Sequence, residues 1–345
     1  MASQLPKTIL LSRIDNLGDV VLTLPMAKVI KQHWPECQVI FLCRPYAVDV
    51  VAACPDVDQV ITWQVDQTDQ QVMRVLAEVQ IDTIIHVFPN KQLARCAKRV
   101  GIQQRIGTSH RLYHWWTCNI RPSFSRAKSD LHEAQLNLQL LSAIGIDADL
   151  SVDTLSQSIY LQPSLSQQQT VQPWLDPNRF SLVLHPLSNA NGREWPLENY
   201  VALCHKLDSE RYQILLNGVE AERDRLAPLI QLIPDNQQLF SLSLADKVAL
   251  FAQCDGMVVG STGPLHIAAA VGMPVLGLFP PKHTMNPKRW QPIGPKARYL
   301  VDNVDCQQIC SNTDCACMEA LTVDQVVEVI CEWYNAASFE IGAIK

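Results

Sequence analysis

The sequence predicts an α/β protein made of two doubly wound domains, each built on a parallel sheet. Short runs rich in Val, Ile and Leu alternate with helix-length amphipathic stretches along most of the chain. A polar, proline-marked stretch interrupts this alternation near the middle. The 345 residues, 48% of them hydrophobic and 18% charged, suffice for two domains of roughly 150 residues with sizeable buried cores.

The first half contains strand and helix candidates in turn. Strands are expected at residues 9–11, 39–42, 60–61 and 84–87, and helices at residues 20–34 and 70–79. Apart from His86, these strand candidates are apolar, which is typical of strands buried on both faces of a parallel sheet that helices cover. We therefore expect successive βαβ units.

The alternation stops at residues 161–173, LQPSLSQQQTVQP, and restarts at residue 180. Strands are then expected at residues 180–185, 212–216 and 256–259, and helices at 197–207, 220–230, 244–253 and 323–334. We assign residues 1–162 to an N-terminal domain, 163–179 to a linker and 180–322 to a C-terminal domain. Residues 323–345 are expected to form a last helix, and the sequence leaves open whether it packs back on the N-terminal domain.

The overall composition argues against several classes of protein. A formal net charge of −6 provides no basic field for nucleic acid. No uninterrupted apolar run reaches the ~20 residues that cross a bilayer. The apolar run that ends at Leu11 is followed at once by polar Ser12 and Arg13, so we expect no signal peptide and a cytoplasmic protein.

Four of the twelve cysteines form a cluster near the C-terminus: Cys306, Cys310, Cys315 and Cys317. Their C-x3-C-x4-C-x-C spacing departs from the paired C-x2-C knuckles of structural zinc sites. Most of the other cysteines are scattered through strand-like and helix-like segments, where they behave as small hydrophobic residues in a reducing compartment. We expect a loop held by packing or by a reversible disulfide, and no metal.

The first candidate for chemistry is Asp19, which lies where the first strand gives way to a helix. Ligands of doubly wound sheets bind at the carboxyl ends of the strands. A carboxylate there suits a general base, worth ~10²–10⁴-fold in rate. It equally suits the N-terminus of the helix, where it contributes ~0.3–1 kcal/mol. Spacing alone leaves both interpretations open, and neither G-x-G-x-x-G nor a P-loop motif occurs here.

Two loops of the second half carry further candidates. In residues 185–196, HPLSNANGREWP, Ser188 and Arg193 offer a hydroxyl and a guanidinium that suit a phosphate. Pro196 suits the first position of the next helix, and an ordinary solvated loop has the same composition. Glu222 follows the strand at 212–216 and suits either a ribose hydroxyl or the first turn of a helix.

Residues 260–281, GSTGPLHIAAAVGMPVLGLFPP, place polar groups at the start of a helix of small residues. Ser261 or Thr262 can cap this helix, and Gly263 lets its backbone approach a ligand. The free N–H groups of a first helical turn attract phosphate through hydrogen bonds and the helix dipole. His266 is either a contact in this site or a buried histidine with its own partners. Together, the four sites favour a nucleotide-linked ligand.

Five segments, taken in order, carry a family resemblance. They are residues 13–25 (RIDNLGDVVLTLP), 105–107 (RIG), 193–198 (REWPLE, an R/K-x-W-P-x-E element), 262–270 (TGPLHIAAA, a T-G-x-x-H-x-A-A-A element) and 317–322 (CMEALT). In this combination they resemble glycosyltransferase family 9, the bacterial lipopolysaccharide heptosyltransferases. The resemblance runs nearly end to end.

The resemblance implies a GT-B fold, in which two Rossmann-like domains face a cleft, with the acceptor in the first and the sugar nucleotide in the second. It implies inverting transfer of a heptose from an ADP-heptose to a lipopolysaccharide core acceptor, with no metal and no other cofactor. The acceptor is a lipid-linked oligosaccharide, so peripheral contact with the cytoplasmic face of the inner membrane stays open. No strongly basic amphipathic helix indicates such contact.

The same resemblance implies roles for the candidate residues. Asp19 deprotonates the acceptor hydroxyl, and Glu222 contacts the nucleoside. Arg44 and Arg105 read anionic groups of the acceptor, although Arg105 equally suits a structural role. The groups that hold the donor and neutralise its departing diphosphate are Ser188, Arg193, Ser261, Thr262, Gly263 and His266.

One position departs from the family pattern. Many members carry Asp where this chain has Ser261, and that carboxylate is associated with the hydroxyls of the donor sugar. A serine still hydrogen-bonds a hydroxyl but makes no charge-assisted contact. The alternatives are therefore a family-9-like transferase with another donor or acceptor, a sugar-nucleotide epimerase of the same architecture, and a catalytically silent binding protein. An epimerase would need further acid and base carboxylates, and we cannot assign any in this sequence. A catalytically silent protein would have little need of a carboxylate at Asp19.

Overall fold

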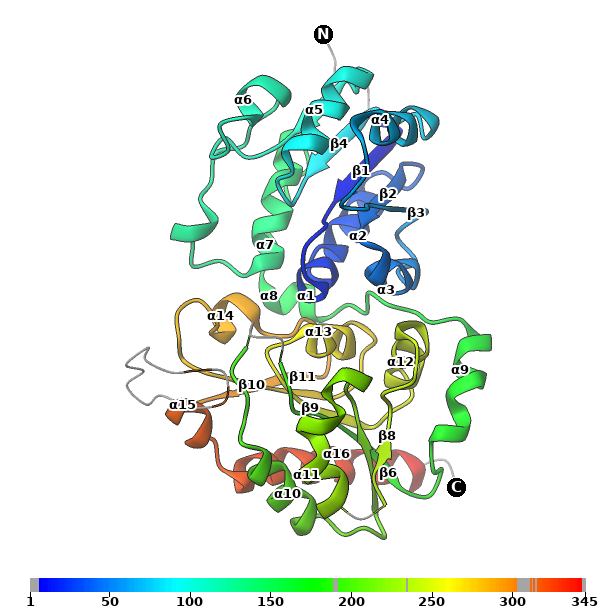
Figure 1. Cartoon of the computed structure of the whole chain (residues 1–345), viewed down its shortest axis with the longest axis vertical. Helices are drawn as coiled ribbons and strands as arrows, with labels where there is room; N and C mark the ends of the chain where they lie inside the picture. The colour runs from blue at the N-terminus through cyan, green and yellow to red at the C-terminus, as the bar shows by residue number, and fades with distance from the viewer. Residues whose placement is uncertain are drawn as a thin grey trace. The chain divides into compact units, whose positions relative to one another are not determined.

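Two parallel sheets, one in each half of the chain, organise the computed structural model of the protein (Figure 1). The structure describes residues 6–188, 192–233, 235–302, 311, 313 and 315–342. It divides into unit 1, Met1–Leu155, and unit 2, Ser156–Lys345. The predicted fold class, two Rossmann-like parallel-sheet domains, is confirmed.

The sheet of unit 1 has the strand order β3-β2-β1-β4-β5, and all neighbours are parallel. Its strands are β1 (Thr8–Ser12), β2 (Gln38–Cys43), β3 (Gln59–Thr62), β4 (Thr83–His86) and β5 (Gln104–Ile106). At the carboxyl end of β1, Ser12 is in register with Leu42 of β2 and His86 of β4. The strand order reverses between β1 and β4, and such a reversal is where doubly wound sheets bind their ligands.

The sheet of unit 1 is accompanied by short helices. They are α1 (Leu17–Val21), α2 (Leu24–His33), η1 (Pro45–Ala47), α3 (Val48–Ala52), α4 (Asp69–Glu78), α5 (Lys91–Val100), α6 (His114–Thr117), η2 (Arg126–Lys128), α7 (Glu133–Leu138), η3 (Gln139–Ile144) and α8 (Val152–Ser156). The single helix expected at residues 20–34 is instead two, α1 and α2. Pro25 explains the break, because proline has no N–H with which to continue the helical ladder.

The sheet of unit 2 has six parallel strands in the order β11-β10-β9-β6-β7-β8. The strands are β6 (Phe180–His185), β7 (Tyr212–Leu216), β8 (Gln237–Gln238), β9 (Gly256–Gly260), β10 (Val275–Phe279) and β11 (Ala297–Val301). This is the order of the dinucleotide-binding fold, with the reversal between β6 and β9. The helices are α9 (Leu165–Val171), η4 (Gln172–Trp174), α10 (Leu197–Lys206), η5 (Glu220–Glu222), α11 (Arg223–Leu232), α12 (Leu244–Phe251), α13 (Gly263–Ala270), α14 (Pro287–Trp290), α15 (Ala316–Glu319) and α16 (Val323–Gly342).

Residues 163–179, assigned from sequence to a linker, are instead part of unit 2. Ser164 and Gln167 form a capping box that starts helix α9. The helix packs on α12, and the Gln253 amide donates to the Gln168 carbonyl oxygen at 3.0 Å. The S-x-x-Q pattern of Ser164 and Gln167 therefore marks the start of a helix. The polar composition of this stretch had instead indicated an inter-domain connection.

The C-terminal helix α16 also packs within unit 2, whereas the sequence left open that it packs on the N-terminal domain. Val326 and Ile330 are fully buried in the main apolar cluster of unit 2, and Trp333 joins them there. Two ion pairs at the surface, Lys206–Asp324 and Arg298–Glu332, lie along the same helix. Within the described part of the chain, no helix has both the length and the apolarity to cross a bilayer.

A pair of buried imidazoles lies at the end of β4. The rings of His86 and His114 stack with their centroids 5.8 Å apart. His114 Nδ1 lies 2.8 Å from the Thr108 carbonyl oxygen. Burial lowers the pKa of His86 to about 3 and also lowers the pKa of His114. Both rings are therefore neutral in the folded protein at neutral pH.

These buried imidazoles make stability depend on pH in a defined direction. An unfolded histidine has a pKa near ~6.5, so the unfolded chain binds more protons below that pH. The buried histidines do not lower the free energy of unfolding above pH ~6.5, but they lower it progressively as the pH falls toward the folded-state pKa of His86. We expect His86→Leu to reduce the loss of unfolding free energy between pH 7 and pH 5 by about 2 kcal/mol.

Denaturant unfolding of the full-length protein at pH 7 and pH 5 measures this change in unfolding free energy. His33→Leu, which replaces an exposed histidine at the end of α2, is the matched control and is expected to leave the difference unchanged. An equal pH dependence in wild type and His86→Leu would show that the buried pair does not couple folding to protonation.

Candidate functional site

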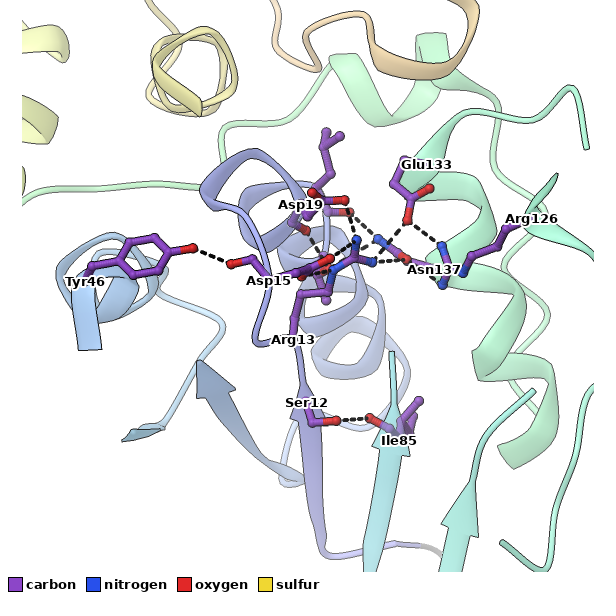
Figure 2. A network of polar contacts seen from close by, with 11 residues as sticks. Ser12, Arg13, Asp15, Asp19, Tyr46, Ile85, Arg126, Glu133 and Asn137 are labelled. Carbon is purple, nitrogen blue, oxygen red and sulfur yellow. Dashed lines mark hydrogen bonds and ion pairs between the residues drawn. The ribbon is translucent and has the colours of Figure 1, made fainter. Parts of the chain in front are cut away.

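The carboxyl end of β1 leads into a buried ionic network centred on Arg13 (Figure 2). The residue is only 4% exposed. Its Nε and Nη2 donate to the two carboxylate oxygens of Asp15 at 2.7 and 2.9 Å. Nη2 also donates to Asp19, and Nη1 donates to Glu133 Oε1 at 3.0 Å. One guanidinium thus contacts three carboxylates.

The local chain explains how Asp19 reaches this network. Strand β1 ends at Ser12, and α1 starts after the extended residue Asn16, whose side chain makes no capping hydrogen bond in the structure described here. Asp19 lies in the first turn of α1, and its side chain turns to Arg13. The Thr23 hydroxyl donates to the Asp19 carbonyl oxygen at 2.8 Å, which ties α1 to the start of α2.

The other side of the network comes from much later in the chain. Helix α7 supplies Glu133 and Asn137, and Arg126 of η2 pairs with Glu133 and donates to Asn137 Oδ1 at 2.9 Å. The Asn137 amide donates to the Leu22 carbonyl oxygen at 3.0 Å. Glu133 is separated from Arg13 by 120 positions. Sequence reasoning missed these three residues, because no local pattern marks them as neighbours of Asp19.

The charge balance of the network affects Asp19. Within it, three carboxylates face two guanidiniums, so one negative charge is in excess. Burial raises the pKa of Asp19 to about 6; Asp15 and Glu133 act in the same direction, and Arg13 opposes them. A carboxyl group that is ionised near neutral pH but holds protons more tightly than usual suits general-base chemistry.

The two predicted acceptor arginines have different surroundings. Arg44 directly follows β2, the neighbour of β1, and its side chain is exposed. It stands two positions before Tyr46, whose hydroxyl donates to the Asp15 carbonyl oxygen. Arg105 lies within β5, where its Nε donates to the Thr117 carbonyl oxygen at 2.8 Å and its Nη1 to Ile102. The guanidinium of Arg105 therefore serves the fold of this segment.

In unit 2, two of the predicted sites lie directly against each other. A Cβ placed on Gly192 would lie only 2.9 Å from the Ser261 carbonyl oxygen, and one placed on Gly260 would lie 3.3 Å from the Arg193 carbonyl oxygen. The backbone of the loop after β6 therefore lies close against the end of β9, an approach that a side chain on Gly192 would prevent. Ser188 and Arg193, both 7% exposed, share this region with Ser261.

Glu194 holds this loop in place. Its Oε1 accepts from the Ser188 N–H at 2.8 Å, and its Oε2 pairs with Arg225 of α11 at 2.6 Å. The Ser188 hydroxyl donates to the Gly192 carbonyl oxygen at 3.1 Å. Residues Asn189, Ala190 and Asn191 of the same predicted site lie outside the described residues. Sequence reasoning did not single out Glu194, although it stands beside Arg193.

The start of α13 differs from the capped helix that the sequence allowed. Thr262 occupies the N-cap position, yet no side chain among the described residues caps this helix, and the Thr262 hydroxyl instead contacts the Gly260 carbonyl oxygen at 3.4 Å. Gly263 and Pro264 form the first two helical positions, and Ser261 is half-buried before them. His266 is buried, 4% exposed, in the first turns. The N–H groups of this helix start therefore do not serve a side-chain cap.

A polar cluster lies at the carboxyl ends of β6 and β7. His185 Nδ1 lies 3.1 Å from both the carbonyl oxygen and the amide nitrogen of Asn217. Lys247 of α12, largely buried, donates to the Gly218 carbonyl oxygen at 2.7 Å. Glu222 Oε2 accepts from the Val219 N–H at 2.9 Å, so it stabilises the turn that precedes α11. Burial lowers the pKa of Lys247, which Glu222 opposes.

The cysteine cluster is only partly covered by the structure. Cys306 and Cys310 lie outside the described residues. Cys315 and Cys317 are buried in the main apolar cluster of unit 2. Among the residues that the structure describes, no group of three or more His, Cys, Asp or Glu side chains is arranged to hold a metal ion.

Known proteins share both sequence and fold with this chain. The model of glycosyltransferase family 9 (heptosyltransferase) matches residues 70–318. A Haemophilus influenzae protein is 25% identical over 85% of this chain and 88% of its own length; it is provisionally named a glycosyltransferase. Lipopolysaccharide heptosyltransferase 3 of Escherichia coli is 21% identical over 76% of this chain and 80% of its own length.

Two solved structures share the fold over nearly the whole chain. The Escherichia coli ADP-heptose lipopolysaccharide heptosyltransferase II has a TM-score of 0.80 at 18% identity and covers 96% of this chain and 99% of its own. A family 9 glycosyltransferase of Veillonella parvula has a TM-score of 0.78 at 16% identity, with 96% and 97% covered. These structures have the GT-B fold that the resemblance implied. The chain therefore belongs to glycosyltransferase family 9, the heptosyltransferase family, and is a glycosyltransferase.

Proposed function

We propose that the protein is an inverting glycosyltransferase that moves a heptose or a related sugar from an ADP-sugar to a lipopolysaccharide core acceptor. The observation that carries this proposal is Asp19, a carboxylate of raised pKa at the carboxyl end of β1 in a member of this family. Related proteins carry the name lipopolysaccharide heptosyltransferase, and one solved relative was crystallised with ADP. The acceptor is then lipid-linked, and the reaction takes place close to a membrane.

In the proposed reaction, Asp19 removes the proton from an acceptor hydroxyl as its oxygen attacks the anomeric carbon of the donor. The bond from that carbon to the diphosphate breaks, and ADP departs with the bonding electron pair. Arg13 fixes the orientation of the Asp19 carboxylate, while Asp15 and Glu133 keep the pKa of Asp19 high enough for it to act as a base.

The departing diphosphate requires positive charge and N–H donors. Arg193 and the uncapped start of α13 at Thr262 and Gly263 offer both, in the region where the loop after β6 touches the end of β9. Ser188 and His266 complete this part of the proposed donor site, and Glu222 contacts the nucleoside. No metal or other cofactor takes part in the proposal.

Two further assignments concern specificity. Ser261, where many family members carry Asp, contacts the hydroxyls of the donor sugar without a charge-assisted bond. This position therefore influences which sugar is transferred. Arg44, exposed at the edge that carries Asp19, reads an anionic group of the acceptor. Arg105 supports the acceptor-binding unit indirectly, because its guanidinium donates to the Thr117 carbonyl oxygen and so holds the chain after β5 in place.

Asp19→Asn is expected to lower kcat by ~10²–10⁴-fold at saturating substrates, because an amide cannot accept the proton. Release of ADP in the presence of acceptor measures this rate. Asp66→Asn, which removes an exposed carboxylate outside the network around Arg13, is the control and is expected to keep the wild-type rate. A wild-type rate in Asp19→Asn would end the general-base assignment.

The pH dependence of the reaction is expected to follow the protonation of Asp19. Since the pKa of Asp19 is about 6, kcat/KM should fall below that pH as the base becomes protonated. Glu133→Gln removes a negative neighbour and should move this decline to lower pH. Rate profiles of both proteins, with thermal unfolding as a check on folding, test the shift. An unmoved or upward-moved decline would contradict the role given to Glu133.

A thermal-shift comparison of ADP-, GDP-, UDP- and CMP-sugars tests the donor assignment. We expect stabilisation by ADP-sugars above the others, by about 2.7 kcal/mol when the ligand is ~100-fold above its Kd. Arg193→Ala should weaken this binding roughly 10- to 100-fold through loss of a charge-assisted hydrogen bond. Arg211→Ala, an exposed arginine after α10, is the control. Preference for another nucleotide would replace the ADP assignment, and binding of none would argue against a donor site.

A further inference from the structure

One segment of unit 1 has a charge unlike that of the rest of the chain. Residues 91–128 contain nine Lys and Arg residues and no Asp or Glu, although the chain as a whole carries a net charge of −6. Several of these cations are engaged elsewhere in the fold: Arg95 and Arg99 pair with Asp69, Arg126 pairs with Glu133, and Arg105 donates to carbonyl oxygens. Of the remainder, Lys98 and Arg121 donate to backbone carbonyl oxygens, which leaves their positive charge uncompensated.

The middle of this segment presents apolar side chains outward. On one side of the one-turn helix α6, His114, Thr117 and Cys118 are buried. On the opposite side, Leu112 is 74% exposed, Trp115 56% and Trp116 64%. The usual orientation of an amphipathic turn is thus inverted, since the outward face carries two indoles and a leucine. Adjacent exposed tryptophans of this kind mark an interaction site.

Basic side chains surround these apolar ones. Lys98, in the last turn of α5, donates to the Trp116 carbonyl oxygen at 2.7 Å, and α5 packs against α6 (Figure 1). The Arg121 guanidinium lies over the Trp115 ring, 4.9 Å from its centroid. Exposed Arg111 precedes Leu112. We call these six residues the α6 surface: Lys98, Arg111, Leu112, Trp115, Trp116 and Arg121.

The α6 surface is anchored to the fold of unit 1 and carries uncompensated charge. Buried His114 stacks on His86, and the Trp115 indole N–H donates to the Ser109 carbonyl oxygen at 3.1 Å. The exposed rings therefore project from a turn that is anchored by a buried ring contact and a hydrogen bond. Within the part of the chain that the structure describes, no acidic side chain pairs with Lys98, Arg111 or Arg121. A partner of this surface must be both apolar in part and negatively charged.

We propose that the α6 surface docks on an anionic lipid bilayer. Tryptophan rings prefer the depth of the lipid headgroups, where their apolar faces meet acyl chains and their polar edges stay wet. Lys and Arg beside them attract anionic headgroups. The proposal rests on the proposed function in one respect: a lipid-linked acceptor makes a bilayer the partner of this charge, in preference to an acidic protein or a nucleic acid.

Sedimentation of the purified full-length protein with lipid vesicles tests this surface. No sugar nucleotide or acceptor is present, so the outcome does not depend on catalysis. The protein should bind vesicles of phosphatidylcholine mixed with phosphatidylglycerol, should bind pure phosphatidylcholine much less, and should lose binding as salt rises. The variant Trp115→Ser/Trp116→Ser should weaken binding at least about tenfold.

The charged part of the surface is tested by Lys98→Gln/Arg111→Gln, which should weaken binding roughly 30-fold. Two control variants remove matched groups elsewhere. Leu165→Ser/Leu232→Ser removes two exposed apolar side chains of unit 2, and Arg74→Gln/Lys296→Gln removes two exposed charges. Both controls should bind vesicles like the wild type, and all four variants should retain transfer to a water-soluble acceptor fragment.

Three results would overturn the docking proposal. They are equal binding to neutral and anionic vesicles, undiminished binding by the tryptophan variant, and binding to the soluble polyanion heparin that depends equally on the two tryptophans. The last result would assign the surface to a charged polymer. Loss of vesicle binding with intact Asp19-dependent transfer would leave the proposed function standing, whereas vesicle binding without transfer would leave the docking surface standing.

Discussion

The buried guanidinium of Arg13 is the interaction on which the arrangement around Asp19 depends. An arginine that is 4% exposed must have its charge neutralised and its donors accepted, since an unpaired buried charge costs several kcal/mol. Asp15, Asp19 and Glu133 supply that compensation together. The requirement joins the end of β1 to α7 and holds the Asp19 carboxylate in one orientation. The same requirement leaves one carboxylate in excess, which fits a proton acceptor.

Unit 2 places its polar groups by a different means. The loop after β6 lies against the end of β9 by backbone contact, and Gly192 makes this contact possible. Glu194 then anchors the Ser188 N–H and Arg225 from the inside of the loop. Arg193 and the start of α13 are thereby brought into one region. Both units carry their polar residues at the carboxyl ends of strands beside the reversal of strand order.

Local patterns predicted most of the central strands, because β1, β2, β4, β6, β7 and β9 are apolar runs bounded by polar residues. The edge strands β5, β8 and β11 were missed, since QRI, QQ and ARYLV are short or polar and depend on a neighbouring strand for their pairing. Asp19, Arg193 and Thr262 were found because each follows a predicted strand. Glu133 and Asn137 were not, because their contacts with Arg13 and Leu22 span more than a hundred residues, and Arg126 joins the network through these two side chains.

The sequence by itself determined the fold class, the family and the residues at the strand ends, since periodicity and short motifs are local properties of the chain. The tertiary structure alone decided how those residues are held and charged. It showed that Arg105 serves the backbone, that Thr262 does not cap α13 and that α16 packs within unit 2. It also turned Trp115 and Trp116 outward. Burial, pKa and the direction of a side chain depend on which distant segments pack around it, and no local pattern contains that information.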